Sequence, residues 1–242
     1  MVNPAKTKFI SFCTAQSKKY DCNHPTIFLG ECPLKAVQNT KFLGLTIDEC
    51  LNWTNHVTAL CNKVSSGIYA LRRMAKICDL DTLKTIYFAF IHSHISFGLI
   101  LYGATSNENL NKILMLQKQA IRIILNLNWN ESVKHRFSQL GILTVYGQYI
   151  FELIMFIRKN LASLSKLGEN HSYQTRNKNK IANVPHKLKF LEKKPSYAGI
   201  KYYNSIPNTI KDITDITIFK RKLRKYLIDR PFYSLNEFFE HM

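Results

Sequence analysis

Carboxylate side chains could support phosphoryl transfer in this chain only if two or three of them gathered to hold a pair of divalent cations. Asp48 and Glu49 are the only adjacent acidic pair at the end of a predicted strand. Neighbouring residues on a strand point to opposite faces, and Asp21 and Glu31 are the only other acidic residues in that region. The sequence therefore predicts no metal centre and no catalytic residue of this kind.

Histidine, cysteine and glycine patterns supply no other chemistry. His92 and His94 lie two residues apart on a predicted helix, on different faces, and we interpret them as core or inter-helix hydrogen-bond partners. The six cysteines contain no CxxC pair, which favours free thiols in a reducing compartment, and we interpret Cys22, His24 and Cys32 as packing. There is no G-x-S-x-G, H-E-x-x-H or glycine-rich phosphate loop.

The charge balance points to binding rather than catalysis. The 242 residues include 34 Lys and Arg against 16 Asp and Glu, a net charge of +18. Such a field attracts polyanions, and nucleic acid is the commonest polyanion inside a cell. The charge is denser in residues 158–242, which carry +11, than in residues 1–157, which carry +7. A generally basic surface without a partner is the alternative.

The apolar pattern predicts an α+β fold. Residues 1–50 read as a small β-meander, with strands expected at 9–13, 26–29, 34–37 and 41–47. From Trp53 the period becomes helical, and residues 51–160 read as a helical bundle with helices near 53–78, 81–95, 107–125, 132–140 and 146–160. Residues 161–242 form a basic region with a loop over 168–195 and a terminal helix over 216–229.

Basic side chains on two of these helices are candidates for phosphate binding. A helix can lay a row of cations along a phosphate backbone, and the polar side of the first bundle helix carries Lys63, Arg72, Arg73 and Lys76. The terminal helix is similar, with its run FKRKLRKYL. A solvated helix face is the alternative in both cases. No apolar run reaches 18 uninterrupted residues, so we expect a soluble, intracellular protein of the cytoplasm or nucleus and no membrane partner.

Read in order, the motifs resemble the downstream part of the reverse transcriptase of non-LTR, LINE-type retrotransposons, within it the jockey-like group. Asn3-Pro4-x-Lys6-Thr7 before a hydrophobic strand is similar to the family's polymerase motif D. Lys41-Phe42-Leu43-Gly44-Leu45-x-Ile47-Asp48 resembles the primer-grip hairpin at the end of the palm. Leu51-Asn52-Trp53-x-x-His56 then follows as in the family.

The resemblance continues over nearly the whole chain. The matching segments are Ser96 through Leu101-Tyr102-Gly103, Leu116-Gln117-Lys118 with Ala120-Ile121-Arg122-Ile123-Ile124, Tyr173-x-Thr175-Arg176, and Gly199-x-x-x-Tyr203-Asn204-x-Ile206-Pro207. Two departures occur. Ala104-Thr105-Ser106 stands where the family usually has a Trp, and Tyr203 and Ile206 replace the usual Trp and Leu.

The resemblance implies roles for particular residues. Lys6 would be the motif D lysine proposed to protonate the leaving pyrophosphate, although without aspartates a strand-edge lysine is the better interpretation. Leu43 and Gly44 would support the primer terminus. The helices at 53–78 and 107–125 would form a thumb that holds the product duplex through its phosphates, which adds Lys118 and Arg122 to the candidate nucleic-acid-binding residues.

The expected partner is therefore an RNA/DNA primer–template, with no small-molecule substrate. The family's fingers, first catalytic aspartate and Y-x-D-D box precede motif D and are absent from these residues, so we expect no enzymatic activity from this chain as it stands. No cofactor is expected in it, and Mg²⁺ would belong only to the complete polymerase. Two alternatives stay open: a 5′-truncated version of an active reverse transcriptase, or a decayed or domesticated basic interaction module.

Overall fold

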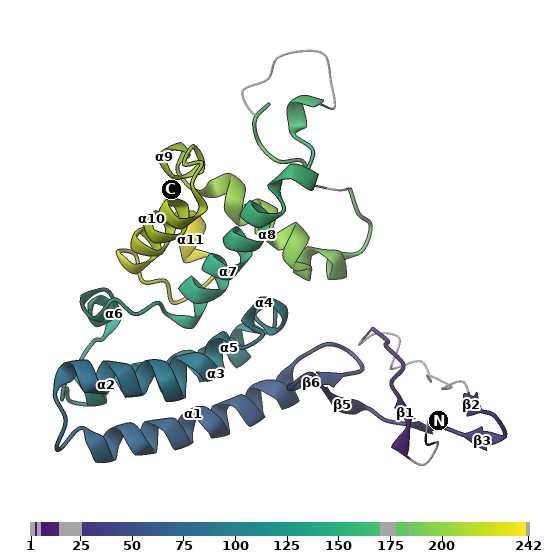
Figure 1. Ribbon diagram of the computed structural model, residues 1–242, viewed down its shortest axis with the longest axis horizontal. Coiled ribbons are helices and arrows are strands. Elements are labelled where there is room, and N and C mark those ends of the chain that lie inside the picture. Colours follow the sequence, from purple (N-terminus) through teal and green to yellow (C-terminus); the bar gives the residue numbers. More distant parts are fainter. Residues whose placement is uncertain (1–2, 4–5, 15–25, 170–177, 184, 241–242) are drawn as a thin grey trace. The chain divides into compact units, whose positions relative to one another are not determined.

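The computed structural model describes residues 3, 6–14, 26–169, 178–183 and 185–240 (Figure 1). The chain contains two compact units, Met1–Asn62 and Lys63–Met242, here called the N-terminal and C-terminal units. The predicted α+β class is confirmed, since short strands are followed by helices. The Cys22 and His24 pair, Asp21 and the Tyr173-x-Thr175-Arg176 motif lie outside the described residues.

The strands of the N-terminal unit form three separate two-stranded ladders. β1 (Lys8–Phe9) pairs in parallel with β4 (Lys35–Ala36). The other two ladders are antiparallel and join β2 (Phe28–Leu29) to β3 (Cys32–Pro33), and β5 (Asn39–Phe42) to β6 (Leu45–Asp48). The predicted single β-meander is therefore wrong in topology. Local turn signals indicate hairpins, whereas the β1–β4 pairing joins segments that are distant in sequence.

Helix α1 (Thr54–Met74) begins in the N-terminal unit and continues into the C-terminal one. Its predicted apolar stripe is buried, as shown by Val57, Val64 and Leu71. Gly67 allows close packing in the C-terminal unit, because a Cβ there would lie 2.8 Å from the Phe90 carbonyl oxygen.

The helix expected over 81–95 is interrupted. It consists of α2 (Leu80–Tyr87), a π-helix (Phe88–His92) and α3 (Ser93–Ser96). Its N-cap is Asp79, because Asp79 Oδ1 accepts the Thr82 N–H at 3.2 Å. Asp81 lies in the first turn, where an acidic side chain favours the positive end of the helix dipole.

Helix α7 is central to the packing of the C-terminal unit. The remaining described helices of this unit are α4 (Leu99–Tyr102), α5 (Asn107–Ile124), α6 (Lys134–Leu140), α7 (Val145–Lys159), α8 (Pro195–Ser205), α9 (Asn208–Lys211), α10 (Ile216–Ile228) and α11 (Glu237–Glu240), with short 3-10 turns at Leu161–Ser163, Leu167–Glu169 and Lys189–Lys193. Helix α7 is buried along most of its length and contacts α4, α5, α8 and α10 (Figure 1).

Family-like motif residues allow this packing. A Cβ on Gly103 would lie 2.2 Å from Tyr149 Cδ2, and one on Gly199 would lie 2.7 Å from Ile157 Cγ1. Both glycines therefore let a neighbouring segment approach α7 more closely than any other residue would allow.

The stretch expected to be a loop carries a short antiparallel pairing. The Leu167 N–H donates to the Lys180 carbonyl at 2.8 Å, and the Ala182 N–H donates to the Ser165 carbonyl at 3.0 Å. The Asn204 side chain of α8 binds both the N–H and the carbonyl of Ile181, at 3.0 and 2.9 Å. A motif residue of α8 thus fixes the 178–182 segment.

Among the described helices, none alone is long and apolar enough to cross a bilayer. Helices α6 and α7 meet the length and composition criteria only together, as a pair bent by 55°.

Candidate nucleic-acid interface

The cations of α1 are exposed and have no partner among the residues that the structure describes. Arg72 and Arg73 occupy the last turn of the helix, and Lys76 lies in the turn that follows. Lys63 is exposed earlier on the helix. None of the four makes a hydrogen bond or ion pair with the described residues. Lys112 differs, since it is exposed but pairs with Glu108 at 2.8 Å.

These four side chains do not form a single row. Nine residues of α-helix amount to two and a half turns, so Lys63 and Arg72 lie on opposite edges of the exposed face. Arg72, Arg73 and Lys76 form a cluster at the C-terminal end of α1, and Lys63 lies about 15 Å before Arg73 along the helix. We call the three clustered residues the α1 basic cluster. Their position also stabilises the helix, because cations complement the negative end of its dipole.

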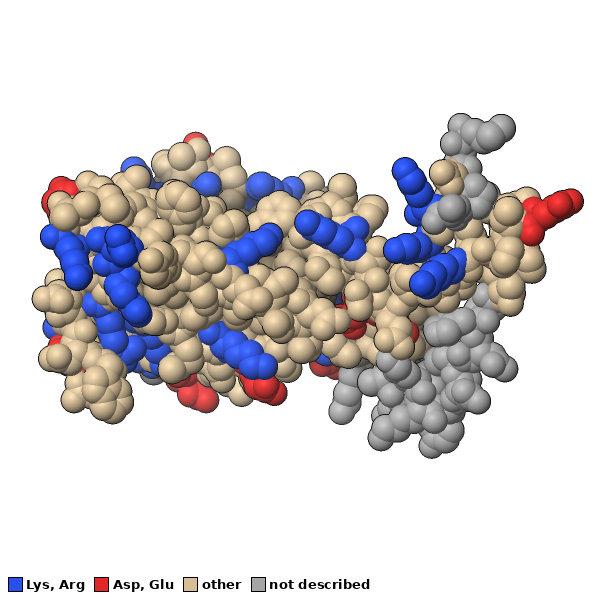
Figure 2. Space-filling view, turned by 90° about the horizontal axis from the view of Figure 1, so that it is seen from below, with Lys and Arg blue, Asp and Glu red and all other residues tan. Residues whose placement is uncertain are grey.

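The surface around the α1 basic cluster is rich in lysine and arginine. Figure 2 shows basic side chains gathered at the end of the molecule where α1 ends, with acidic side chains mostly at the edges of this face. Tyr69 lies one turn before Arg72 and Arg73 and is 64% exposed. An exposed ring beside cations offers a surface on which a base or sugar can pack.

Lys118 and Arg122, the other predicted cations of the thumb, contact the C-terminal end of the chain. The Lys118 ammonium lies 3.9 Å from the centre of the Tyr233 ring. Partial burial, followed by the charges of Arg122 and Lys134, lowers the pKa of Lys118. The Arg122 guanidinium donates to the Glu131 carbonyl at 2.9 Å. Both side chains are half-buried, so they present less charge to a ligand than the α1 basic cluster does.

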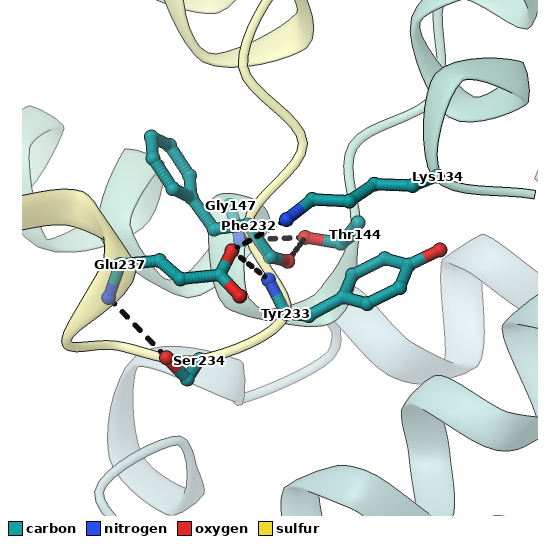
Figure 3. A network of polar contacts seen from close by, with 7 residues as sticks. All are labelled: Lys134, Thr144, Gly147, Phe232, Tyr233, Ser234 and Glu237. Atoms are coloured by element: carbon teal, nitrogen blue, oxygen red, sulfur yellow. Dashed lines mark hydrogen bonds and ion pairs between the residues drawn. The ribbon is translucent and has the colours of Figure 1, made fainter. Parts of the chain in front are cut away.

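Residues 232–237 form a polar network with Lys134 and with the start of α7 (Figure 3). The Thr144 hydroxyl donates to the Phe232 carbonyl at 2.7 Å and accepts the Gly147 N–H at 3.1 Å. Glu237 Oε2 accepts both the Lys134 ammonium at 3.0 Å and the Tyr233 N–H at 2.9 Å. The network attaches the C-terminal segment to the start of α7. The sequence analysis missed this attachment because the residues that it joins are 88 and 103 positions apart.

Leu43 and Gly44 form the two-residue tip of the β5–β6 hairpin. Both have positive φ, 46° and 86° respectively, as a tight hairpin turn of the primed type requires. Leucine is strained in this region, and its side chain is 79% exposed. Strained residues of this kind cluster at functional sites. The role that the resemblance implies for this tip stays a prediction.

Lys6 lies in the turn before β1 and is exposed. The turn is held by the Asn3 carbonyl, which accepts the Lys6 N–H at 3.2 Å, the Thr7 N–H at 3.1 Å and the Thr7 hydroxyl at 2.8 Å. Asn3 and Thr7 of the motif therefore close the turn before β1, in which Lys6 is exposed.

Asp48 serves the backbone rather than a metal. One carboxylate oxygen accepts the Cys50 and Asn52 N–H groups at 3.1 and 3.0 Å, and the other accepts the Trp53 N–H at 2.8 Å. These bonds stabilise a turn in which Leu51 and Trp53 both have positive φ. Within the described part of the chain there is no group of three His, Cys, Asp or Glu side chains able to hold a metal ion. The described carboxylates therefore do not fit a two-metal site.

The C-terminal signature is also a packing motif. The Tyr203 ring stacks on Phe219 of α10, with ring centres 6.5 Å apart, and its hydroxyl accepts a bond from Arg158 at 3.4 Å. Arg158 also donates to the carbonyls of Ile213 and Thr214. These contacts explain the motif without assigning it a ligand.

Comparison with curated proteins finds relatives among retrotransposon polymerases. The chain is 25% identical over 130 residues to the probable RNA-directed DNA polymerase from transposon X-element of Drosophila melanogaster. It is 29% identical over 112 residues to the RNA-directed DNA polymerase from mobile element jockey of the same species, and 26% identical over 132 residues to that of Drosophila funebris. The resemblance to jockey-like retrotransposon reverse transcriptases is confirmed.

These matches cover 41–53% of this chain but only 12–14% of the length of the relatives. No family model matches the chain, and no solved structure matches it.

Proposed function

We propose that this chain is part of a jockey-like RNA-directed DNA polymerase and holds a primer–template duplex through its phosphates. The contact surface comprises Lys63 and the α1 basic cluster. The observation that carries the proposal is that all four cations are exposed and have no partner within the described chain. Unpaired surface cations exchange their counterions for phosphates, which is the main source of sequence-independent affinity.

The contact surface of Lys63 and the α1 basic cluster is suited to binding a duplex without preference for its base sequence. Phosphate contacts fix the position of a duplex but carry no information about base sequence. Tyr69 adds an exposed ring between Lys63 and the cluster, and ring packing against bases or sugars is equally tolerant of sequence. A polymerase must hold every duplex that it makes, so this is the kind of binding that its thumb requires.

We propose that the described residues bind and position nucleic acid and carry out no chemical step. The Asp48 carboxylate already accepts three backbone N–H groups, which leaves it poorly suited to a metal. The exposed hairpin tip at Leu43 and Gly44 would contact the primer strand. Mg²⁺ would supply phosphoryl-transfer chemistry only in a complete polymerase.

Charge reversal tests the proposal. The variant R72E/R73E/K76E should bind a fluorescein-labelled RNA–DNA hybrid at least about tenfold more weakly in fluorescence anisotropy, because three phosphate contacts become repulsive. The loss should be the same for hybrids of unrelated sequence. The comparison variant is K220E/R221E/K225E on α10, the other helix with candidate phosphate-binding cations, which makes the same change in net charge at three exposed positions.

A smaller loss in the α10 control would locate the interface on α1. An equal loss in both variants would show a diffuse response to net charge and would contradict the proposal. Failure of the unmodified chain to bind the hybrid would favour the alternative of a decayed relic.

A further inference from the structure

A cation-lined cavity lies in the C-terminal unit, away from α1. Its volume is about 570 Å³, and its walls come from α7, α8, α9, residues 161–166 and residues 179–181. Four cations line it, namely Arg158, Lys166, Lys180 and Lys211, against the single carboxylate of Asp212. The cavity therefore carries a large local excess of positive charge.

The backbone of Lys180 is positioned by hydrogen bonds at its own carbonyl and at the next residue. Its carbonyl accepts the Leu167 N–H at 2.8 Å. The next residue, Ile181, is bound through its N–H and carbonyl by the Asn204 side chain at 3.0 and 2.9 Å. A short antiparallel pairing and one side-chain amide thus hold the backbone of this lysine at the cavity before any ligand arrives, so binding needs to order only its side chain.

Lys211 and Arg158 are held by neutral groups. The Lys211 ammonium donates to the Asn204 carbonyl at 2.7 Å. Burial and then the charge of Lys180 lower the pKa of Lys211, with Asp212 opposing the shift. The Arg158 guanidinium donates to backbone carbonyls and to the Tyr203 hydroxyl. Arg158, Lys180 and Lys211 form no ion pair with a carboxylate of the described residues, so no described carboxylate neutralises their charges.

We propose that this cavity binds the phosphate of a nucleotide, either free or at the 5′ end of a strand. Converging cations and the amides of Asn179 and Asn208 suit a phosphate and a sugar. Leu161 and Leu164 provide an apolar wall against which a base can pack. The volume falls within the range of about 300–1,000 Å³ that is typical of small-ligand sites. The site shares no residue with the α1 surface and does not rest on the proposed function.

Isothermal titration with AMP, adenosine and inorganic phosphate tests the site. AMP should bind, adenosine should bind at least about tenfold more weakly, and inorganic phosphate should compete with AMP. The variant K180E should weaken AMP binding at least about tenfold, because it replaces a phosphate partner with a repulsive charge. Lys180 is exposed, so the fold should survive, and thermal unfolding would verify this. The matched control is K193E, an exposed lysine outside the cavity.

Short oligonucleotides distinguish the two possible sources of the phosphate, a free nucleotide and the 5′ end of a strand. In the R72E/R73E/K76E background, a short oligonucleotide with a 5′-phosphate should bind more tightly than the same strand with a 5′-hydroxyl if strand ends are the ligand. If AMP binds and the two strands do not differ, the ligand is the free nucleotide. Equal binding of AMP and adenosine, equal losses in K180E and K193E, or no binding of AMP and no preference for a 5′-phosphate would overturn the proposal.

Discussion

Gln117 Oε1 accepts the Val145 N–H at 2.7 Å and so joins the middle of α5 to the first residue of α7. The amide nitrogen of the same side chain donates to the Tyr87 hydroxyl at 3.0 Å and to the Leu143 carbonyl at 3.3 Å. A single buried amide thus connects α2, α5 and the turn before α7. This explains why a glutamine stands in the motif that resembles the family's thumb helix.

Gln117→Ala should destabilise the chain by about 3 kcal/mol, because it leaves the Val145 N–H and the Tyr87 hydroxyl buried without partners. Urea unfolding would measure the loss. Tyr87→Phe removes one of the partners and should cost less, since Gln117 keeps its other bonds. An unchanged free energy of unfolding in Gln117→Ala would refute this role.

Gly103→Ala should destabilise the chain by about 2 kcal/mol, because its Cβ would overlap the Tyr149 ring. Gly147→Ala is the matched control. Gly147 is a buried residue of α7 itself, but a Cβ there would make only an ordinary contact at 3.4 Å, and alanine favours a helix. Thermal unfolding should therefore separate the two variants. Similar midpoints would show that the close approach at Gly103 relaxes freely.

Leu43→Asn should stabilise the hairpin by about 1 kcal/mol, because asparagine tolerates positive φ better than leucine does. The same change removes an exposed apolar side chain from the proposed primer contact, so affinity for a primer–template should fall. Thermal unfolding and anisotropy would be measured on the same preparation. A rise in stability without a loss of affinity would remove Leu43 from the interface.

Acid should destabilise the chain through His92. Burial and then the charge of Arg224 hold the pKa of His92 below its ordinary value of 6.5. As the pH falls below 6.5, the unfolded chain takes up this proton before the folded chain does, and the free energy of unfolding decreases. Above that pH the imidazole is neutral in both states and contributes no pH dependence.

His92→Gln should therefore flatten the decrease in stability below pH 6.5, and Arg224→Gln should reduce it in part. Urea unfolding at a series of pH values from 7.5 to 5.5 would measure the effect. An identical pH profile in His92→Gln would assign the acid sensitivity to other groups.

The bundle helices could be predicted from the sequence because their signals are local. The buried stripe of α1 and the Ser106 cap of α5 both follow from residues three or four positions apart, and Asn109 N–H does donate to Ser106 Oγ at 3.3 Å. Helix α8 was not predicted, because tyrosines such as Tyr202 and Tyr203 form much of its buried face. The parallel β1–β4 pairing depends on contacts between distant segments and leaves no local signal.

The candidate site was predictable only in part for the same reason. Exposure of Arg72 and Arg73 follows from helical periodicity, since they lie off the apolar stripe. The half-buried state of Lys118 depends on Tyr233, which lies 115 positions later. The cavity around Lys180 depends on Asn204 and on a pairing within a stretch whose composition indicates a loop. Both require the three-dimensional arrangement.

The salt dependence of duplex binding tests the central claim most directly. Each neutralised phosphate contributes about −0.9 to the slope of log K against log salt concentration. Neutralising the α1 basic cluster as R72Q/R73Q/K76Q should therefore flatten the slope by about 2.7, whereas K220Q/R221Q/K225Q on α10 should change it less. A slope that is the same in the α1 variant as in the unmodified chain would contradict the account, because the α1 cations would then release no counterions on binding.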